Sequence, residues 1–481
     1  MEKENKSERN ETERQAIIAA YLFAEQGLTQ SEIAEHLEIS QSEVSRRLRL
    51  AEGRWLSRPR FVKKELSESE NRDLEASYYR AIDDLRKCVV RLCPGGQAPA
   101  VSVFHSGLPR ADASGLIKPA EYAKAQTLFG RLAALQFRRI FSTHHYRHVG
   151  VAWGSLIGRL TKGLDPLSEI PRDEDAIFFP ISGEPMKASE EHESATSLAM
   201  HFQKWLGSRK LAVPELRGVI SCINDKFVSA CIDDRLDAQG SRSRDFEQVI
   251  KAIKCDLLGF VEAYRRIFLG QAHPLMGKEQ PAEPLISSMD ALITGVGTAS
   301  KHNRDPWLDV RIQAMQSDPV LTQEDFEAYM YGDIAGVYLL KPNLPALIRE
   351  RLMSKSTGAT STASRTMKDS GSPGQRAAPA IIEKLNRVNE IWTGIQHNQI
   401  KRCAERARAD QDEAIRERKR GRLRARRSIG VIVVAIGRHK AEVLAAALAA
   451  GLINYLIIDQ DLAEGLMAAS ESLAGDRSKR P

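Results

Sequence analysis

The sequence predicts an α/β protein whose N-terminal region is a separate helical unit. Residues 14–56 read as three short helices with two capping signals, which is typical of a helix-turn-helix. Between residues 149 and 437, four apolar strands end in glycine and alternate with helical patterns. Since buried parallel strands are continuous apolar runs connected by helices, this rhythm predicts a Rossmann-like parallel sheet.

The composition is that of a globular protein. The 481 residues are 42% hydrophobic and 28% charged and allow roughly two to four domains. The longest strongly apolar stretch, Val443–Ile458, has 16 residues, fewer than the roughly 20 needed to cross a bilayer. Because the first residues also lack the apolar region of a secretion signal, we expect a cytoplasmic protein with no membrane partner. The six cysteines form no C-x-x-C pair, so we expect free thiols, no metal site and no cofactor.

Positive charge is concentrated in two segments. The chain has 70 Lys and Arg against 63 Asp and Glu, a net charge of +7. Residues 401–427 contain twelve basic and five acidic residues, and residues 41–64 contain eight basic and two acidic residues. Such an excess suggests an anionic partner. The sequence leaves open whether residues 401–427 contact phosphates or form a solvated extension whose charges pair internally.

The predicted head, residues 14–64, contains two marked helix starts after a first apolar helix. Thr29 with Glu32, and Ser40 with Glu43, each fit the S/T-x-x-E capping box. The two caps are eleven positions apart, which leaves room for one short helix and a tight turn. This spacing predicts a helix-turn-helix.

The third helix of the head is expected to contact DNA. Val44 and Leu48 form its inner stripe, so the polar residues around them face outward. Gln and Arg can make two hydrogen bonds to one base edge, and Ser and Arg can also bind phosphates. The predicted DNA-contacting residues are Thr29, Gln30, Gln41, Ser42, Ser45, Arg46, Arg47 and Arg49. Residues 54–60 fit a wing, and an ordinary helical bundle with a solvated basic face is the alternative.

Strands and helices alternate through the remainder of the chain. A linker helix is predicted over residues 74–89, a strand over residues 98–104 and an amphipathic helix over residues 124–141. The apolar strands that follow are Val149–Gly154, Ile177–Gly183, Ala291–Gly297, Ile429–Gly437 and the last one, Asn454–Asp459.

Glycines at four strand ends predict a ligand site, because ligands of parallel sheets bind beyond the carboxyl ends of the strands. These glycines are Gly154, Gly183, Gly297 and Gly437. Nearby hydroxyl and cationic side chains, such as Ser155 and Lys440, suit phosphate and sugar oxygens. The residues alone leave three alternatives open: a plain strand-to-helix turn at Ser155, a solvated Lys440, and a turn-forming role for Asp333.

Several short motifs also occur in a characteristic order. They are Gly150–Gly154 (GVAWG), Asp290–Gly297 (DALITGVG), Tyr331–Ile334 (YGDI), Trp392–Ile395 (WTGI), Lys440–Glu442 (KAE) and Gly451–Asn454 (GLIN). Together with LTQSEIAEHL and SQSEVSRRL in the head, this series resembles the SorC family of sugar-binding transcriptional regulators. The resemblance covers residues 70–341 and 381–475.

The resemblance implies a fold similar to ribose-5-phosphate isomerase and glucosamine-6-phosphate deaminase, with a phosphorylated sugar bound as an effector and not turned over. By this analogy Trp153, Gly154 and Ser155 hold phosphate. Gly183, Asp333 and Lys440 then lie near the sugar. Family members often carry Thr soon after the Trp-Gly pair, whereas Ser155 and Leu156 follow here.

The expected domains follow from these patterns. They are a tail (1–13), the head (14–64), an effector-binding domain (65–341 and 381–475), a flexible Ser/Thr/Gly-rich insert (342–380) and a basic extension (401–427) inside the effector domain.

The predicted function is that of a non-enzymatic transcriptional regulator of carbohydrate metabolism. It would bind double-stranded operator DNA as a homodimer or tetramer and respond to a sugar or sugar phosphate. One alternative is a sugar-phosphate isomerase or deaminase with an appended head, for which Asp333 is a candidate acid or base. Another is a general nucleic-acid-binding protein that uses residues 401–427.

Overall fold

The structure is a computed structural model. It describes residues 12–13, 15–23, 30–37, 39–52, 56–57, 60–61, 80–104, 106, 119–164, 174–183, 194–216, 218–233, 246–270, 283–299, 306–315, 321–358, 373–420 and 428–478.

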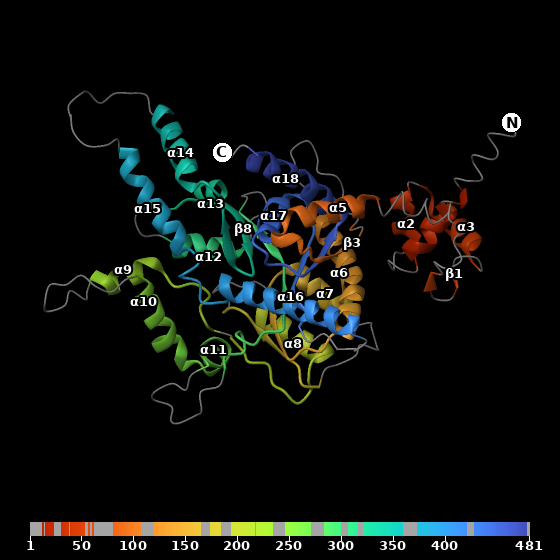
Figure 1. Cartoon of the computed structure of the whole chain (residues 1–481), viewed down its shortest axis with the longest axis horizontal. Helices are drawn as coiled ribbons and strands as arrows, with labels where there is room; N and C mark the ends of the chain where they lie inside the picture. Colours follow the sequence, from red (N-terminus) through yellow and green to blue (C-terminus); the bar gives the residue numbers. More distant parts are fainter. Residues whose placement is uncertain are drawn as a thin grey trace.

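A helical head lies at one end of the molecule (Figure 1). Residues 15–23 form its first helix, followed by α2 (Gln30–Leu37) and α3 (Gln41–Ala51). Ile17, Leu22 and Ile33 are buried together with the inner stripe of α3. A short antiparallel hairpin comes next, made of β1 (Leu56–Ser57) and β2 (Arg60–Phe61). The helix-turn-helix predicted from the caps is therefore confirmed.

A six-stranded parallel sheet forms the centre of the rest of the chain, as the glycine-ended strands predicted. Its order is β3-β11-β10-β6-β4-β5, and all its neighbours pair in parallel. The strands are β3 (Ala100–Phe104), β4 (His148–Val151), β5 (Ile177–Pro180), β6 (Ala291–Thr294), β10 (Gly430–Ala435) and β11 (Tyr455–Asp459).

Helices cover both faces of this sheet. One face packs on α6 (Pro119–Ser142), α7 (Ser155–Leu164) and α8 (Ala195–Leu206). The other face packs on α5 (Arg80–Leu92), α16 (His397–Lys419), α17 (Ala441–Ala449) and α18 (Gln460–Ser478). Side chains alternate between the two cores along β10: Ile432 and Val434 face the first, Val431 and Val433 the second. A strand buried on both faces explains why its sequence is continuously apolar.

A second group of elements lies at the end of the molecule away from the head (Figure 1). It contains the antiparallel strands β7 (Val296–Thr298), β8 (Met330–Ile334) and β9 (Val337–Leu340). Its helices are α9 (Asp225–Asp233), α10 (Phe246–Ala252), α11 (Glu262–Tyr264), α12 (Pro306–Ala314), α13 (Gln323–Tyr329), α14 (Leu344–Gly358) and α15 (Pro373–Arg387). A buried ion pair between Lys384 and Asp225, with N and O 3.2 Å apart, joins α15 to α9.

The predicted flexible insert contains more regular structure than its composition suggested, and the basic extension is partly packed against the domain. Helices α14 and α15 both begin inside the insert 342–380. Ile348 of α14 and Leu385 of α15 are fully buried in one core, which stabilises both helices. Residues 359–372 lie outside the described part. The basic extension begins within α16, where Cys403 is buried under the sheet. Arg406 and Arg408 donate hydrogen bonds to the carbonyls of Ser287 and Gly451.

Candidate functional site

The outer face of α3 is the first candidate site. Ser40 caps the helix by accepting a hydrogen bond from the Glu43 backbone amide at 3.2 Å, and this cap fixes where the helix begins. Val44 and Leu48 are buried. Gln41, Ser42, Arg46 and Arg49 are exposed and Ser45 is half-buried. Because the cap fixes the start of α3 and the buried stripe fixes its rotation, the predicted polar face points to solvent.

Arg46 and Arg47 differ sharply although they are neighbours. The Arg46 side chain is 70% exposed and reaches Glu43 only at 4.0 Å. The Arg47 side chain is 14% exposed, pairs with Glu43 at 3.0 Å and donates to the Gln15 side-chain oxygen at 3.3 Å. Arg47 therefore ties α3 to the first helix, while Arg46 is available to a partner.

The remaining predicted head residues lie on α3 or at the start of α2. Arg49 donates to the Ser45 hydroxyl at 3.4 Å on the exposed face. Gln30 is the first residue of α2 and is half-buried. Thr29, predicted to cap α2, lies outside the described residues.

A group of loops at the carboxyl edge of the sheet is the second candidate site. Strands β6 and β4 are neighbours in the sheet, and the strand order reverses between them. After β4 the chain continues to β5 on one side, and after β6 it continues to β10 and β11 on the other side. Such a switch point opens a crevice beyond the strand ends, where ligands of this fold class bind. The loop that follows β4 contains Gly154, while β6 leads through Gly295 into β7, which contains Gly297.

The loop after β4 is an open turn at a helix N-terminus. Gly154 has φ +127°, which favours glycine, and a Cβ added there would meet nothing within 4 Å. Ser155 is the first residue of α7, and its hydroxyl accepts a hydrogen bond from the Gln126 side chain at 3.0 Å. Unpaired amides at this helix end suit an anion.

The β7–β8–β9 sheet brings Asp333 and Gly297 together, because they are paired across β7 and β8. Gly332 must be glycine here, since its Cβ would lie 2.1 Å from the Gly297 carbonyl oxygen. The Asp333 carboxylate accepts a hydrogen bond from the Gly336 amide at 2.8 Å. Burial raises the pKa of Asp333, while this hydrogen bond and the charges of Arg311 and Lys440 oppose the rise. Asp333, Gly297 and Lys440 therefore form one cluster, although they are far apart in sequence.

The tip of the β8–β9 hairpin is held between two tryptophans. A Cβ at Gly336 would lie 2.4 Å from the Trp392 ring and 2.7 Å from the Trp153 ring. The two ring centroids are 5.4 Å apart. Trp153, predicted beside the phosphate turn, thus contacts the hairpin that carries Asp333.

Arg311 on α12 holds this hairpin in place through hydrogen bonds and ring contacts. It is 2% exposed and donates to the carbonyls of Gly336 and Val388. Its guanidinium lies 4.1 Å from the centre of the Trp392 ring and 5.1 Å from that of Tyr338. These are cation–π distances.

The loop after β10 carries Gly437 and Lys440. Gly437 has φ +91° and donates its amide to Asp459 at 3.0 Å. Asp459 is fully buried and also accepts from the Ser106 hydroxyl at 2.7 Å, so it holds the loop in place. Burial lowers the pKa of His439 to about 4, and the charge of Lys440 adds to the effect.

Gly183 has a different role from the other predicted glycines. Its Cβ would lie 2.2 Å from the Val219 carbonyl oxygen, so glycine is required there by close backbone packing. The adjacent Ser182 is fully buried, and its hydroxyl has no hydrogen-bond partner among the described residues.

Sequence reasoning did not identify several residues that shape this site. They are Tyr122, Gln126, Arg311, Asp459 and Ser106. Each lies in an ordinary helix, at the end of a strand or shortly after one, and only the packing of distant segments brings it to the loops.

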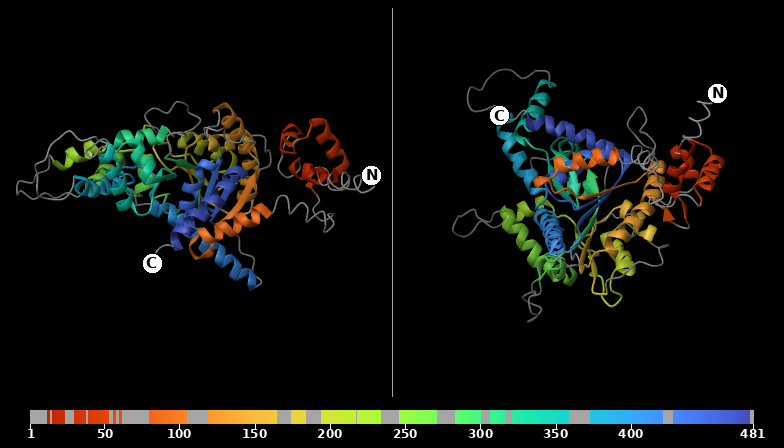
Figure 2. Two further views of the ribbon diagram at one scale, coloured as in Figure 1. Left: turned by 90° about the horizontal axis from the view of Figure 1, so that it is seen from above. Right: turned by 45° about the vertical axis from the view of Figure 1, so that its right-hand side comes forward.

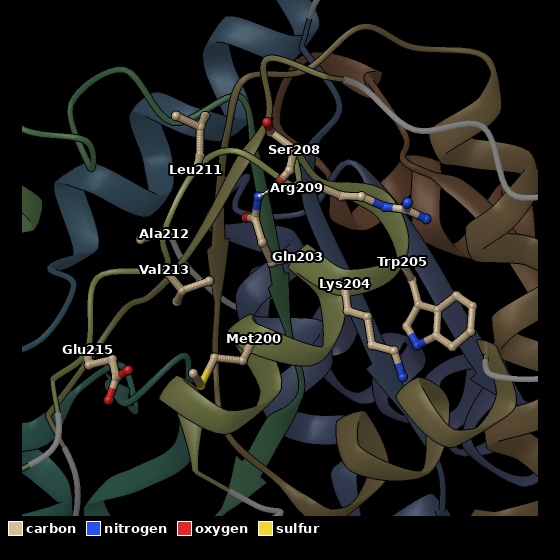
Figure 3. A pocket seen from close by; sticks show the side chains of 10 residues that line it. All are labelled: Met200, Gln203, Lys204, Trp205, Ser208, Arg209, Leu211, Ala212, Val213 and Glu215. Carbon is tan, nitrogen blue, oxygen red and sulfur yellow. Dashed lines mark hydrogen bonds between the residues drawn. The ribbon is translucent and has the colours of Figure 1, made fainter.

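A surface hollow of about 730 Å³ lies elsewhere, along α8 and the segment after it (Figure 3). Its lining includes Met200, Lys204, Trp205, Arg209 and Leu211. The segment begins where Ser208 donates its amide to the Ala176 carbonyl, next to the start of β5. This is the amino edge of the sheet, opposite the predicted site, and none of the predicted residues lines the hollow.

Within the described residues, no group of three or more His, Cys, Asp or Glu could hold a metal ion. None of the helices described is both long and apolar enough to span a membrane. Five cysteines, Cys88, Cys93, Cys222, Cys255 and Cys403, are free thiols.

Comparisons with known proteins give one family match and several similar structures. Residues 10–52 match the family described as Sigma-70, region 4. Among curated proteins, no sequence matches the chain. The full-length sorbitol operon regulator SorC from Klebsiella pneumoniae is similar with 14% identity and a TM-score of 0.40, covering 94% of this chain and 98% of that one.

Two further similar structures are also described as transcriptional regulators. One, from Streptococcus pneumoniae, has 13% identity and a TM-score of 0.39, covering 83% of this chain and 99% of its own. The other, a DeoR family regulator from Listeria monocytogenes, has 14% identity and a TM-score of 0.37, with 80% and 99% covered.

Proposed function

We propose that this protein is a DNA-binding transcriptional regulator of carbohydrate metabolism whose affinity for operator DNA changes when a sugar or sugar phosphate binds. The observation that carries the proposal is the outer face of α3. It presents Gln41, Ser42 and Arg46 to solvent above a buried stripe, behind a side-chain cap. These side-chain types read base edges and bind phosphates when such a helix enters the major groove.

The effector would bind beyond the carboxyl ends of β4, β6 and β10. The amides at the start of α7, with the turn Trp153–Ser155, suit a phosphate. Asp333 and Lys440 supply an acceptor and a donor for sugar hydroxyls, and Gly297 and Gly437 let the backbone approach the ligand. Gly183 contributes by packing against Val219 behind the loops.

The chain would act as a homodimer or tetramer in the cytoplasm. A symmetric oligomer places two heads on two half-sites about one helical turn of DNA apart. Thr29, Gln30, Ser45, Arg47 and Arg49 complete the DNA surface, with Arg47 acting mainly through its bonds to Gln15 and Glu43. No catalytic step is assigned.

A sugar-phosphate isomerase or deaminase is the second candidate. Asp333 favours it, because a buried carboxyl whose pKa is raised by burial is a residue type that serves as a general acid or base. Assays on one preparation of the full chain distinguish the two functions. A regulator changes its DNA affinity without consuming the sugar, whereas an enzyme converts the sugar phosphate.

The experiment selects duplexes from a random pool and then measures affinity for the selected and a scrambled duplex. A panel of aldose and ketose phosphates and their parent sugars is added, and each compound is quantified afterwards. We expect a preference of about 10³-fold or more for the selected duplex. One compound should change that affinity by about 5- to 150-fold without being consumed. Failure to prefer any duplex, or steady consumption of a sugar phosphate, would contradict the proposal.

A further inference from the structure

Helix α6 contacts the loops of the ligand site through one of its faces. The Tyr122 hydroxyl donates to the Ile436 carbonyl at 3.4 Å, and the Tyr122 ring centre lies 6.0 Å from that of His439. One turn later, Gln126 donates to the Ser155 hydroxyl at 3.0 Å. Residues four apart share one face of a helix, so α6 touches the loop after β10 and the loop after β4 together.

The same helix contacts the head. Leu128 is half-buried and packs against the core of the head as well as against the core between α6 and the sheet. Figure 2 shows the head lying next to α6. Leu128 is two residues beyond Gln126, which places it on the opposite side of the helix. One side of α6 therefore faces the ligand loops, and the other faces the head.

Close packing makes α6 and α7 a single rigid pair. A Cβ at Gly130 would lie 2.7 Å from the backbone of Arg159, and a Cβ at Gly163 would lie 2.9 Å from the Gly130 carbonyl oxygen. Backbones this close cannot slide past each other without new clashes. A shift at the N-terminus of α7, where Ser155 begins the helix, therefore also shifts α6.

We infer that α6 is the mechanical link between the ligand site and the DNA-binding head. Tyr122 and Gln126 contact the ligand loops, so a displacement of these loops moves α6, and Leu128 transmits this movement to the core of the head. This inference rests on the proposed function, because it specifies how that ligand site is coupled to DNA. Coupling between two sites needs one structural element whose position depends on both of them. Helix α6 contacts both the ligand loops and the head.

The first test is hydrogen exchange of the full chain without DNA or sugar. Leu128→Ala and the milder Leu128→Gln should raise exchange of the amides of residues 16–22 about fivefold or more. Gln126→Ala should also change the exchange of these amides. In the Leu128→Ala background, adding Gln126→Ala should cause no further change. Arg131→Ala, an exposed residue of the same helix, is the matched control and should have no effect. If Gln126→Ala leaves residues 16–22 unchanged, the inference is overturned, whether or not the chain binds DNA.

The second test uses the duplex that the wild-type chain selects from a random pool. Gln126→Ala should change the Kd for this duplex about fivefold or more, and should leave it unchanged in the Leu128→Ala background. Equal effects in both backgrounds would overturn the link while leaving the proposed function intact. Absence of any selected duplex would instead contradict the proposed function, and the exchange experiment would then decide the link alone.

Discussion

Arg46 in the head and Arg311 under the β8–β9 hairpin carry the same charge in opposite surroundings. Arg46 is 70% exposed and lies beside a single carboxylate at 4.0 Å. Arg311 is 2% exposed, lies over two aromatic rings and donates to two backbone carbonyls. The exposed arginine is free to meet a partner, whereas the buried one organises the chain itself. The two regions should therefore respond differently to the same substitution.

The largest expected effect is on stability, at Arg311. Arg311→Ala leaves the carbonyls of Gly336 and Val388 without their donor and removes the buried one of the two cations whose charge acts on Asp333. Removing one member of a buried charged network costs about 3–5 kcal/mol. Chemical denaturation followed by tryptophan fluorescence measures this loss, because Trp153 and Trp392 lie at the hairpin. Arg46→Ala should change the free energy of unfolding by less than about 0.5 kcal/mol, and equal losses would refute the comparison.

Leu48 tests how far the head depends on its small core. Leu48→Ala removes a side chain that is 5% exposed, which costs about 2–5 kcal/mol, so the head should unfold and DNA binding should be lost. Leu50→Ala on the same helix is the control, since Leu50 is 46% exposed. Helix content by circular dichroism and DNA affinity are the readouts. Retained binding in the Leu48 variant would mean that the head is stabilised from outside its own core.

Arg46 should determine selectivity more than affinity. Arg46→Ala is expected to reduce the preference for the selected duplex by about 1–3 kcal/mol, with a smaller loss on scrambled DNA. Competition binding with both duplexes measures the difference. Equal losses on the two duplexes would reassign Arg46 to phosphate contact.

Lys440 should affect the ligand response alone. Lys440→Ala removes one of the two cations whose charge acts on Asp333, so DNA affinity should stay the same while the coupling of about 1–3 kcal/mol is lost. Arg438→Ala, an exposed neighbour, is the control for general loss of positive charge. Titrating the active compound against both variants bound to the selected duplex tests this. A normal response in the Lys440 variant would exclude the residue from the site.

The smallest effect is a pH dependence at His439. Burial lowers its pKa to about 4 in the folded chain, against about 6.5 when unfolded. The unfolded state therefore binds the extra proton first, and stability falls as pH drops from about 6.5 toward 4. His439→Gln should make the free energy of unfolding less sensitive between pH 7 and pH 5 than in the wild type. His148 and His397, whose pKa values are also lowered by burial, remain in both proteins, so the difference isolates His439.

Local patterns were enough to predict the head and the sheet. The Ser40 cap and the stripe of Val44 and Leu48 depend on neighbours within one or two helical turns, so the sequence shows them directly. The apolar strands that end at Gly154 and Gly437 are equally local. A sheet buried on both faces needs such strands wherever they lie in the chain.

The composition of the proposed ligand site was predicted only in part. Gly154, Asp333 and Lys440 could be chosen from strand ends and motifs, and the structure brings Asp333, Lys440 and Gly297 together. Arg311 and Gln126 carry no local signal, because an arginine or glutamine in a helix usually faces solvent. Their positions follow from the crossing of α6 with α7 and the packing of α12 under the hairpin.

The sequence by itself determined which elements form and which face of each is apolar, since helix caps and side-chain periodicity act over a few residues. Only the tertiary structure decided that Arg47 faces inward while Arg46 faces outward, that Gly336 lies between Trp153 and Trp392, and that Leu128 meets the head. The physical reason is that burial and close contact depend on segments far apart in the chain, whose meeting no local pattern records.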